Sequence, residues 1–481
     1  MTAQARNRIG GRVVASTGGT FERRDPADDR EVVSVAPEST DDDVRAAVDA
    51  AVAAAPAWAA TTAIARADLL ERAAAALAAR VDDVALLLSR EEGKPVGDAR
   101  NETGRAVRNL RAFAGEALRL RGATFPPDEP GVSVRTAVGP IGVVGVITPW
   151  NFPLSLSSRK LAPALAAGNT VVWKPSPMTP AVSDLLADAF DEAGVPAGVV
   201  NVVHGFAAGA ALTADTRVAG ITFTGSTATG RKIHAAVGIG RRTQLELGGN
   251  NPIVVLADAD MARAADVVAR STFSLTGQAC TGAGRVYVDD AVHDELVERV
   301  VAIASAYVLG PGTRDGVTMG PLVDRSALEA MEAVVADAEQ RGAKAACGGR
   351  RATGDGLDHG WFFPPTLLVD VDPSMRTSCQ EVFGPVVGVE RVGGLDDAIA
   401  RANDSEYGLA AAICTTSIAH AQRFCDEVQA GIVKVNRATI GAAFGAPFGG
   451  VKASTSGSYK EQLGPGVMDF YTTVRTVEVG S

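Results

Sequence analysis

Three side chains with the chemistry needed to attack a carbonyl group lie in three separate segments of this 481-residue chain. A thiolate nucleophile needs a base that accepts its proton or activates water, and a donor that stabilises the developing oxyanion. Cys280, Glu246 and Asn151 are the right types for these tasks. A single cysteine is more often a small buried apolar residue, so the prediction depends on all three segments together. The segments are Gly277-Gln278-Ala279-Cys280-Thr281, Glu246-Leu247-Gly248-Gly249-Asn250 and Pro149-Trp150-Asn151-Phe152-Pro153.

Size and charge exclude several classes of protein. A chain of this length with 46% hydrophobic residues can bury a large core, and about two to four domains are expected. The net charge of −10, from 46 basic and 56 acidic residues, provides no basic excess for binding nucleic acid. The alanine-rich stretch 46–65 is interrupted by Asp49 and Pro56, which argues against a membrane span.

The cysteines and the N-terminal residues favour a cytoplasmic protein. Five cysteines without CxxC spacing are typical of reduced thiols. The first residues lack the apolar core of a secretory signal. No HExxH or paired-cysteine pattern predicts a metal site, so none is expected.

The order of predicted elements indicates an α/β protein. Residues 40–118 have helical periodicity, with an N-cap at 39–41 and a break at 91–95 that ends the second helix. An edge strand at 132–138 turns into a buried strand at 141–147, and short β-rich runs follow at 170–173, 199–204, 221–224 and 253–256. Helical stretches between the first of these runs predict a parallel sheet with crossover helices, as in nucleotide-binding domains.

A second α/β unit is predicted after Cys280. Its expected strands are 286–288, 385–392 and 411–415, and its expected helices are 294–307, 327–340 and 395–403. The last segment, 468–479, is predicted as one strand. It has no local partner, so it is expected to pair with the region around Val132 or with another subunit.

Seven segments in a fixed order give the chain a resemblance to the aldehyde dehydrogenase superfamily over almost its whole length. The resemblance implies a Rossmann-like cofactor domain (1–121 and 145–247), a catalytic domain (248–445) and oligomerisation strands (122–144 and 466–481). It also implies a homodimer or homotetramer. The segments are 149–153, Lys174-Pro175-Ser176, Phe223-Thr224-Gly225-Ser226 with Gly230, 246–250, 277–280, Glu381-Val382-Phe383-Gly384-Pro385 and Pro447-Phe448-Gly449-Gly450-Val451-Lys452.

The resemblance assigns the chemical steps to the same three residues. Cys280 would form a thiohemiacetal with an aldehyde and then, after hydride transfer to the nicotinamide, a thioester. Glu246 would be the base for thioester hydrolysis, and Asn151 would donate its amide to the oxyanion beside the backbone N–H of Cys280. The alternatives are a packing thiol, a surface or capping acid and an ordinary Asn-Phe-Pro turn.

A set of residues would bind the nicotinamide cofactor by the same resemblance. Lys174 would bind the adenosine ribose or a phosphate, and the turn 225–230 before a helix would hold the pyrophosphate. Glu381 would bind the nicotinamide ribose, with Phe383 beside it; a solvated acid is the alternative. The full set is Trp150, Lys174, Ser176, Pro177, Gly225, Ser226, Gly230, Leu247, Gly248, Glu381 and Phe383.

Pro177 departs from the pattern of NAD-preferring members, which carry an acid three residues after the lysine. A carboxylate there binds the ribose hydroxyls and repels a 2′-phosphate, so its absence removes a barrier to NADP. Use of both NAD and NADP is therefore expected.

Arg159 points to an acidic substrate. Semialdehyde dehydrogenases resemble this chain in carrying arginine at that position, near Phe152 on the substrate side, and a guanidinium pairs well with a carboxylate. An arginine satisfied by a neighbouring acid is the alternative reading.

Residues 435–439, 447–452 and 469–477 are most similar to α-ketoglutaric semialdehyde (2,5-dioxopentanoate) dehydrogenases. The segment 454–459, Ser-Thr-Ser-Gly-Ser-Tyr, departs from the usual family ending.

The expected activity is NAD(P)-dependent, non-phosphorylating oxidation of a small acidic semialdehyde to the acid. Succinate semialdehyde and aromatic aldehydes are the alternative substrates. A coenzyme A-acylating relative is disfavoured because Glu246 supplies a base for hydrolysis. A catalytically silent structural protein of the same fold is the alternative of another class, and it would have no use for Cys280, Glu246 and Asn151 together.

Overall fold

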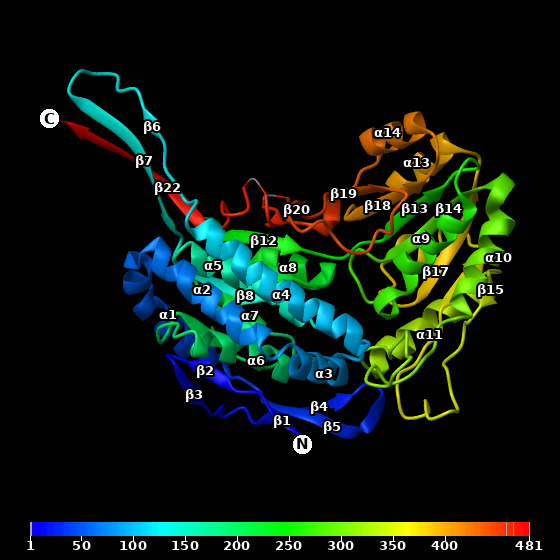
Figure 1. Ribbon diagram of the computed structural model, residues 1–481, viewed down its shortest axis with the longest axis horizontal. Helices are drawn as coiled ribbons and strands as arrows, with labels where there is room; N and C mark the ends of the chain where they lie inside the picture. The colour runs from blue at the N-terminus through cyan, green and yellow to red at the C-terminus, as the bar shows by residue number, and fades with distance from the viewer. Residues whose placement is uncertain (1, 458, 465, 481) are drawn as a thin grey trace.

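The computed structural model describes residues 2–457, 459–464 and 466–480, and it is built on two seven-stranded sheets and a projecting three-stranded arm (Figure 1). Ser458 of the altered segment 454–459 lies outside the described residues. Met1 and Ser481, the outer ends of the predicted ranges 1–121 and 466–481, also lie outside them.

The first sheet has the order β12-β11-β8-β9-β10-β2-β3, with β2 and β3 antiparallel at one edge and the other strands parallel. The chain runs from β8 through β9 to β10 on one side and places β11 and β12 on the other. The strand order therefore reverses at β8, and ligands bind at such reversals in open parallel sheets. The strands are β2 (Asn7–Ile9), β3 (Arg12–Val14), β8 (Val143–Ile147), β9 (Thr170–Lys174), β10 (Val200–Val202), β11 (Val218–Thr224) and β12 (Arg242–Glu246).

Eight helices are associated with this half of the described chain. Thr40 caps the first one, as predicted, through a capping box with Asp43. Residues 41–117 form four helices, and the predicted break at 91–95 follows the third of them and not the second. Thr62 caps a new helix by accepting a hydrogen bond from the N–H of Ala65, and the uninterrupted alanine pattern hid that boundary. The helices are α1 (Asp41–Ala60), α2 (Ala63–Ala78), α3 (Val81–Glu92), α4 (Val96–Ala117), α5 (Pro153–Ala166), α6 (Pro180–Glu192), α7 (Ala208–Ala214) and α8 (Thr227–Val237).

The second sheet has the order β15-β16-β17-β14-β13-β18-β19 and is parallel except for β15. The run 253–256, which follows the predicted strands of the first sheet in the chain, lies mostly in β13 of this second sheet. Hydropathy alone does not report which sheet a buried strand joins. The strands are β13 (Asn251–Val255), β14 (Ala283–Asp289), β15 (Lys344–Cys347), β16 (Thr366–Val369), β17 (Val386–Val392), β18 (Ala410–Cys414) and β19 (Ile432–Val435).

The helices of this second half match the predicted ones closely at 293–304, 325–340 and 395–403. The first helix after β13 and the last one before β19 were not predicted. The helices and 3₁₀ turns of this half are α9 (Met261–Phe273), η1 (Ser274–Gly277), η2 (Asp290–Val292), α10 (His293–Ala304), α11 (Arg325–Gln340), α12 (Arg376–Cys379), α13 (Leu395–Asn403), α14 (Ile418–Glu427) and η3 (Lys452–Ser454).

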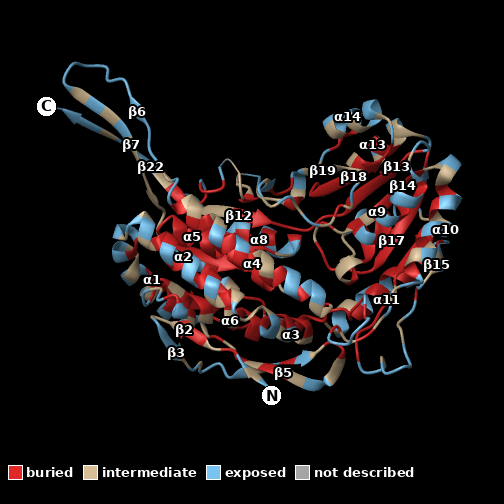
Figure 2. Ribbon diagram, in the orientation of Figure 1, coloured by how far each residue is buried: buried red, intermediate tan, exposed pale blue. Residues whose placement is uncertain are grey.

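The arm joins two distant parts of the chain. The C-terminal strand pairs with the Val132 region, as predicted, with Thr472 opposite Pro140 and Gly480 opposite Val132. Residues 468–471 form a turn instead of the predicted strand, because Phe470 and Tyr471 are buried in the main body and Asn169 donates to the Tyr471 carbonyl at 2.8 Å. The arm is largely exposed (Figure 2). Its strands are β6 (Thr124–Phe125), β7 (Val132–Pro140) and β22 (Thr472–Gly480).

Two small sheets complete the described structure. The N-terminal strands β1 (Ala3–Gln4), β4 (Thr20–Asp25) and β5 (Asp28–Pro37) were not predicted, because β4 carries mostly charged residues. Strands β20 (Pro447–Phe448) and β21 (Glu461–Gln462) pair near the first sheet. The proposed domain boundaries at 121, 247 and 445 stay predictions. Among the described residues no single helix is both long and apolar enough to cross a membrane, although the bent pair α1 and α2 passes that test jointly.

Candidate active site

Cys280 and Asn151 line the same cavity of about 280 Å³, here called the thiol cavity. Asn151 lies in the loop after β8, and Cys280 follows η1. The cavity therefore lies at the carboxyl end of the parallel strands, where the strand order reverses. Its lining comprises Pro149, Trp150, Asn151, Leu156, Thr224, Gly225, Ser226, Leu247, Gly248, Cys280, Glu381 and Phe383.

The Asn151 amide is held in place by the segment that carries the thiol. Its Nδ2 donates to the carbonyl oxygen of Gln278 at 2.9 Å, two residues before Cys280. A carboxamide nitrogen has two N–H groups, so this contact leaves one donor for an oxyanion. Asn151 is buried, which strengthens any hydrogen bond that the second N–H makes.

The turn before Cys280 has an unusual backbone. Leu275 and Thr276 both have φ of 55°, a left-handed conformation that is uncommon for side chains with a Cβ. Gly277 has φ of 68°, and a Cβ there would collide with the main chain of Gly384. Only glycine fits at this position of the motif, because any side chain would collide with the main chain of Gly384. Burial, together with the carboxylates of Glu381 and Glu246, raises the pKa of Cys280 to about 12, so the thiol is neutral until a base takes its proton.

Glu246 ends β12 and is buried beside the thiol cavity without lining it. Neither of its carboxylate oxygens has a hydrogen-bond partner within the described part of the chain. A Cβ on Gly449 would lie 2.6 Å from its Oε1, so only glycine leaves room for the carboxylate there. Burial and the neighbouring Glu461 raise the pKa of Glu246 well above its ordinary value.

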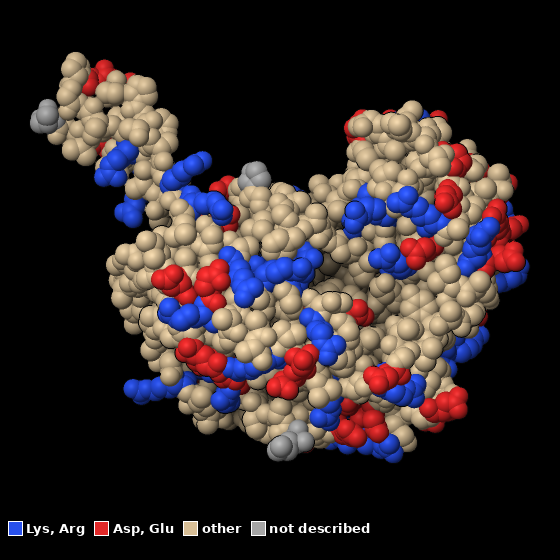
Figure 3. All heavy atoms as spheres, viewed as in Figure 1, with Lys and Arg blue, Asp and Glu red and all other residues tan. Residues whose placement is uncertain are grey.

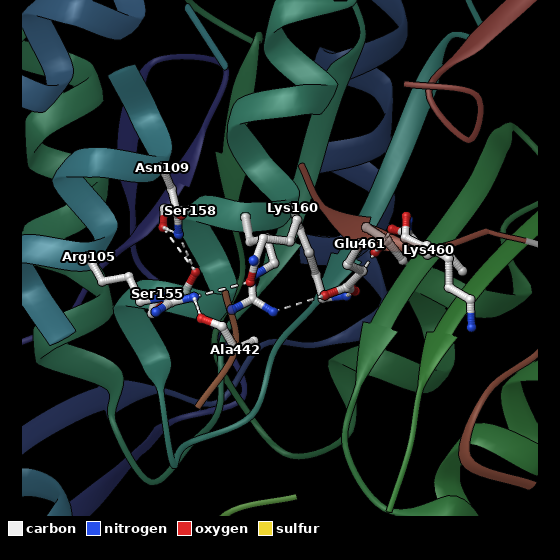
Figure 4. A network of polar contacts seen from close by, with 12 residues as sticks. Arg105, Asn109, Ser155, Ser158, Lys160, Ala442, Lys460 and Glu461 are labelled. Atoms are coloured by element: carbon white, nitrogen blue, oxygen red, sulfur yellow. Dashed lines mark hydrogen bonds and ion pairs between the residues drawn. The ribbon is translucent and has the colours of Figure 1, made fainter. Parts of the chain in front are cut away.

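A buried ion pair beside Glu246 was not found from the sequence. Lys160 on α5 pairs with Glu461 on β21, and its Nζ also donates to Thr222 Oγ1 at 3.0 Å (Figure 4). Lys160 belongs to a helix whose residues are all buried. A lysine in such a buried helix requires a charged partner, so the sequence could have predicted a buried ion pair. It contained no pattern that identified Glu461 as the partner.

Most of the predicted cofactor residues lie together. Trp150, Gly225, Ser226, Leu247, Gly248, Glu381 and Phe383 all line the thiol cavity, whereas Lys174, Ser176, Pro177 and Gly230 do not. Trp150 and Phe383 form an edge-to-face pair with ring centroids 5.6 Å apart. Burial raises the pKa of Glu381 to about 7, and its Oε1 accepts a hydrogen bond from the N–H of Gly249 at 3.1 Å.

Two glycines of this region allow close packing of neighbouring side chains. A Cβ on Gly248 would collide with the Glu381 carboxylate, so glycine keeps that carboxylate close to the backbone. Gly230 packs against Leu247 and has a structural role in seating α8. Ser226 caps α8 by accepting from the N–H of Thr229, and the first turn of this helix lies next to the cavity. Helix N-termini of this length bind phosphate groups.

Lys174 lies at the end of β9, farther along the same edge of the sheet. Burial lowers its pKa to about 8, and the carboxylate of Glu38 partly offsets that effect. The Ser176 hydroxyl accepts a hydrogen bond from the N–H of Met178 at 3.2 Å, next to Pro177. No carboxylate occupies position 177.

Arg159 is buried on α5, one turn beyond Ser155. Its Nε and Nη1 have no hydrogen-bond partner among the described residues, and its guanidinium lies over the Phe448 ring at 4.9 Å. Glu461 is 4.0 Å away but pairs more closely with Lys160. Burial lowers the pKa of Arg159. A neighbouring acid therefore leaves most of the hydrogen-bonding capacity of this guanidinium unused.

Phe152 lines a second cavity of about 420 Å³, here called the substrate-side cavity. This cavity shares no lining residue with the thiol cavity. Residues 151 and 156 line the thiol cavity, whereas their chain neighbours 152 and 155 line the substrate-side cavity. The first turn of α5 and the residues just before it therefore border both spaces.

Comparison with known proteins agrees with this geometry. A relative from Haloferax volcanii named alpha-ketoglutarate semialdehyde dehydrogenase is 42% identical over 99% of both chains. Succinate-semialdehyde dehydrogenase [NADP(+)] of Escherichia coli is 40% identical over 94% of this chain and 93% of its own. The crystal structure of betaine aldehyde dehydrogenase from Staphylococcus aureus with NAD+ superposes with a TM-score of 0.95, at 31% identity over 99% of this chain and 95% of its own.

The family model described as the aldehyde dehydrogenase family matches residues 13–477. With relatives this similar over nearly the full length, the fold and the class of enzyme follow together. The chain belongs to the aldehyde dehydrogenase family and is an oxidoreductase.

Proposed function

We propose that this enzyme oxidises a small acidic semialdehyde, such as 2,5-dioxopentanoate, to the corresponding acid with NAD or NADP. The observation that carries the proposal is the shared cavity of Cys280 and Asn151, close to a buried arginine with free N–H groups. The name of the 42% identical relative supports the same substrate class.

In the first step the Cys280 sulfur forms a bond to the aldehyde carbon, and the carbonyl oxygen becomes an oxyanion. The free N–H of Asn151 and the backbone N–H of Cys280 stabilise that charge, an arrangement worth roughly 3 to 4 kcal/mol. Because the pKa of the thiol is about 12, its proton must be transferred to a base as the bond forms.

The nicotinamide cofactor, when bound, accepts the hydride that leaves the thiohemiacetal carbon. Trp150, Phe383 and Glu381 line the thiol cavity and would orient it against the sulfur, and Gly225 and Ser226 at the start of α8 would hold its phosphates. The remaining thioester is attacked by water.

Glu246 removes the proton from that water. Its raised pKa suits a base that works near neutral pH. The neighbouring ion pair sets the charge around this base: Glu461 raises the pKa of Glu246, and Lys160 partly offsets that effect. Hydrolysis restores the free thiol and releases the acid.

Arg159 supports an acidic substrate because a buried guanidinium with unpaired N–H groups gains most from a carboxylate partner. Succinate semialdehyde is the second candidate, favoured by the 40% identity to the Escherichia coli enzyme of that name. Aromatic aldehydes have no such support among these observations.

A panel of aldehydes tests the proposal. The enzyme is assayed with 2,5-dioxopentanoate, succinate semialdehyde, benzaldehyde and pentanal, each with NAD and NADP, by absorbance of the reduced cofactor. The expected result is a kcat/KM for the acidic aldehydes at least about tenfold above that for pentanal, equivalent to about 1.4 kcal/mol. Arg159→Leu should remove most of this preference. An unchanged preference in that variant contradicts the role of Arg159, and no turnover of any aldehyde contradicts the activity itself.

A further inference from the structure

The substrate-side cavity contains arginines that the proposed mechanism does not use. Arg105 and Arg108 on α4 line it, together with Phe152 just before α5, Ser155 of α5 and Ser274 of η1. These last three residues belong to the two segments that also position Asn151 and Cys280. The cavity therefore adjoins the reacting groups on the side away from the nicotinamide residues.

A larger groove of about 890 Å³, here called the outer groove, continues from this cavity. The two spaces share Arg105, Ile440 and Gly441, so Arg105 lies at their junction. The outer groove is basic: besides Arg105 its lining includes Arg263, Arg270, Lys434 and Arg437 against the single acid Asp266.

Such a concentration of cations is unexpected in a chain of net charge −10. Figure 3 shows basic side chains on both sides of a hollow at the centre of the face drawn. A concave surface lined by one sign of charge raises the local concentration of oppositely charged solutes.

Arg105 is free to bind an anion. Its Nη2 donates to the Ala442 carbonyl at 3.1 Å and to Gln462 Oε1 at 3.2 Å, both neutral acceptors (Figure 4). No carboxylate forms an ion pair with it within the described residues. Burial and the nearby charges of Arg159 and Arg108 lower its pKa to about 10, an unfavourable environment that a bound carboxylate would relieve.

The acids in the same cavity do not cancel this charge. Glu102 is neutralised by Lys94, whose Nζ lies 2.6 Å from its Oε2, and its other oxygen accepts from the N–H groups of Leu154 and Ser155. Burial raises the pKa of Asp98. Arg105 is therefore the charged group of this cavity best placed to meet an entering substrate.

We infer that Arg105 is a specificity-determining residue whose guanidinium binds the carboxylate of the aldehyde in the substrate-side cavity. The inference rests on the proposed function and deepens it. It adds to Arg159, which is buried and lines neither cavity, a neighbouring arginine that faces open space and that the carboxylate can reach. The outer groove would then draw acidic aldehydes toward Arg105.

The test compares Arg105→Leu and Arg105→Lys with the matched control Arg111→Leu. Arg111 lies on the same helix, is 53% exposed, and contacts Glu71 away from the cavity. With 2,5-dioxopentanoate, Arg105→Leu should raise KM by about 10- to 100-fold, the range expected for loss of one charge-assisted hydrogen-bonded contact. Arg105→Lys should restore part of the affinity, and Arg111→Leu should leave KM unchanged.

Pentanal separates a binding role from a structural one. It has no carboxylate, so its KM should change less than about threefold in Arg105→Leu, because one neutral contact is worth little. An equal loss of kcat/KM for both aldehydes would mean that Arg105 only supports Ala442 and Gln462, and it would overturn the inference. An unchanged KM for the acidic aldehyde would overturn it as well.

Binding of the diacid glutarate, measured by calorimetry on wild-type and variant enzymes, does not depend on turnover. Arg105→Leu should weaken it by about tenfold or more, and Arg111→Leu should not. Lack of turnover with every aldehyde, alongside an Arg105-dependent glutarate affinity, would contradict the proposed activity alone. Glutarate affinity that is equal in Arg105→Leu and wild type would contradict the carboxylate site alone.

Ionic strength provides a further measurement. Attraction by the outer groove predicts that kcat/KM for 2,5-dioxopentanoate falls as salt rises from about 0.01 to 0.15 M, because the screening length shrinks from about 30 to 8 Å. The value for pentanal should stay constant over the same range. Equal salt dependence for both aldehydes would contradict the steering role of the groove.

Discussion

The ammonium of Lys94 lies 2.7 Å from the main-chain oxygen of Asn151 and donates a hydrogen bond to it. The same Nζ lies 2.6 Å from Glu102, and Glu102 also accepts from the N–H groups of Leu154 and Ser155 at the start of α5. One buried ion pair thus holds both Asn151, the proposed oxyanion donor, and the helix that follows it.

Replacing Lys94 should destabilise the protein. Lys94→Met leaves Glu102 and Glu92 buried without their cation, and breaking such a pair costs about 3–5 kcal/mol. Urea unfolding monitored by fluorescence measures the shift in midpoint. The exposed control Arg111→Leu should change stability by less than about 0.5 kcal/mol. A Lys94→Met midpoint equal to wild type would show that the pair contributes no stability.

Removing the amide of Asn151 should slow the chemical step. Asn151→Ala loses the free N–H donor to the oxyanion, and such losses lower kcat by about 100- to 1,000-fold. Rapid-mixing kinetics of the first turnover measure this step directly, and KM should change much less. A burst rate within about threefold of wild type would rule out Asn151 as the oxyanion donor, given that losing a useful donor costs far more.

Glu246 should control release of the acid. Because its pKa is raised, the carboxyl stays protonated to higher pH than an ordinary glutamate and becomes a base only as pH rises through that value. Turnover limited by hydrolysis should therefore increase with pH. Glu246→Gln should remove this dependence and leave a burst of one reduced cofactor per site followed by almost no turnover. Cys280→Ser, the control, should show no burst; sustained turnover in Glu246→Gln would assign the base elsewhere.

The residue at 177 should set the cofactor ratio. In the wild-type enzyme the preference for NAD over NADP is expected to stay below about a thousandfold, roughly 4 kcal/mol. Pro177→Glu adds a carboxylate that repels a 2′-phosphate and should raise that preference by about tenfold or more. Pro177→Ala removes the ring without adding charge and is the control. Comparison of kcat/KM for the two cofactors in all three proteins decides the point.

The arm should mediate self-association into a dimer or tetramer. Val474 on β22 is 60% exposed, and exposed apolar side chains on a projecting sheet favour burial against a second copy. Light scattering after gel filtration should show a dimer or tetramer for the wild type and smaller species for Val474→Lys. Val13 on the edge strand β3 is equally exposed at 60%, so Val13→Lys is the matched control and should not change the mass. A monomeric wild type would contradict the oligomer prediction.

The sequence alone predicted the α/β class, the parallel strands from β8 to β11 and the residues Cys280 and Asn151 that line the thiol cavity. These features depend on local patterns: short apolar runs between helical stretches, and motifs whose small residues let the backbone approach closely. Gly277 illustrates this, since its neighbour's main chain excludes any side chain. The same local patterns did not predict strand β4, whose residues are mostly charged, or strand β12.

Only the tertiary structure decided which charges are buried together. Lys160 and Glu461 are 301 residues apart, and Arg105 and Gln462 are 357 apart, yet each pair is in contact. No periodicity or spacing encodes such a contact. It forms only when the chain comes back at β21 and packs against α4 and α5. The chemistry of each side chain is fixed by its type, but its pKa and its partners depend on desolvation and neighbouring charge, which exist only after folding.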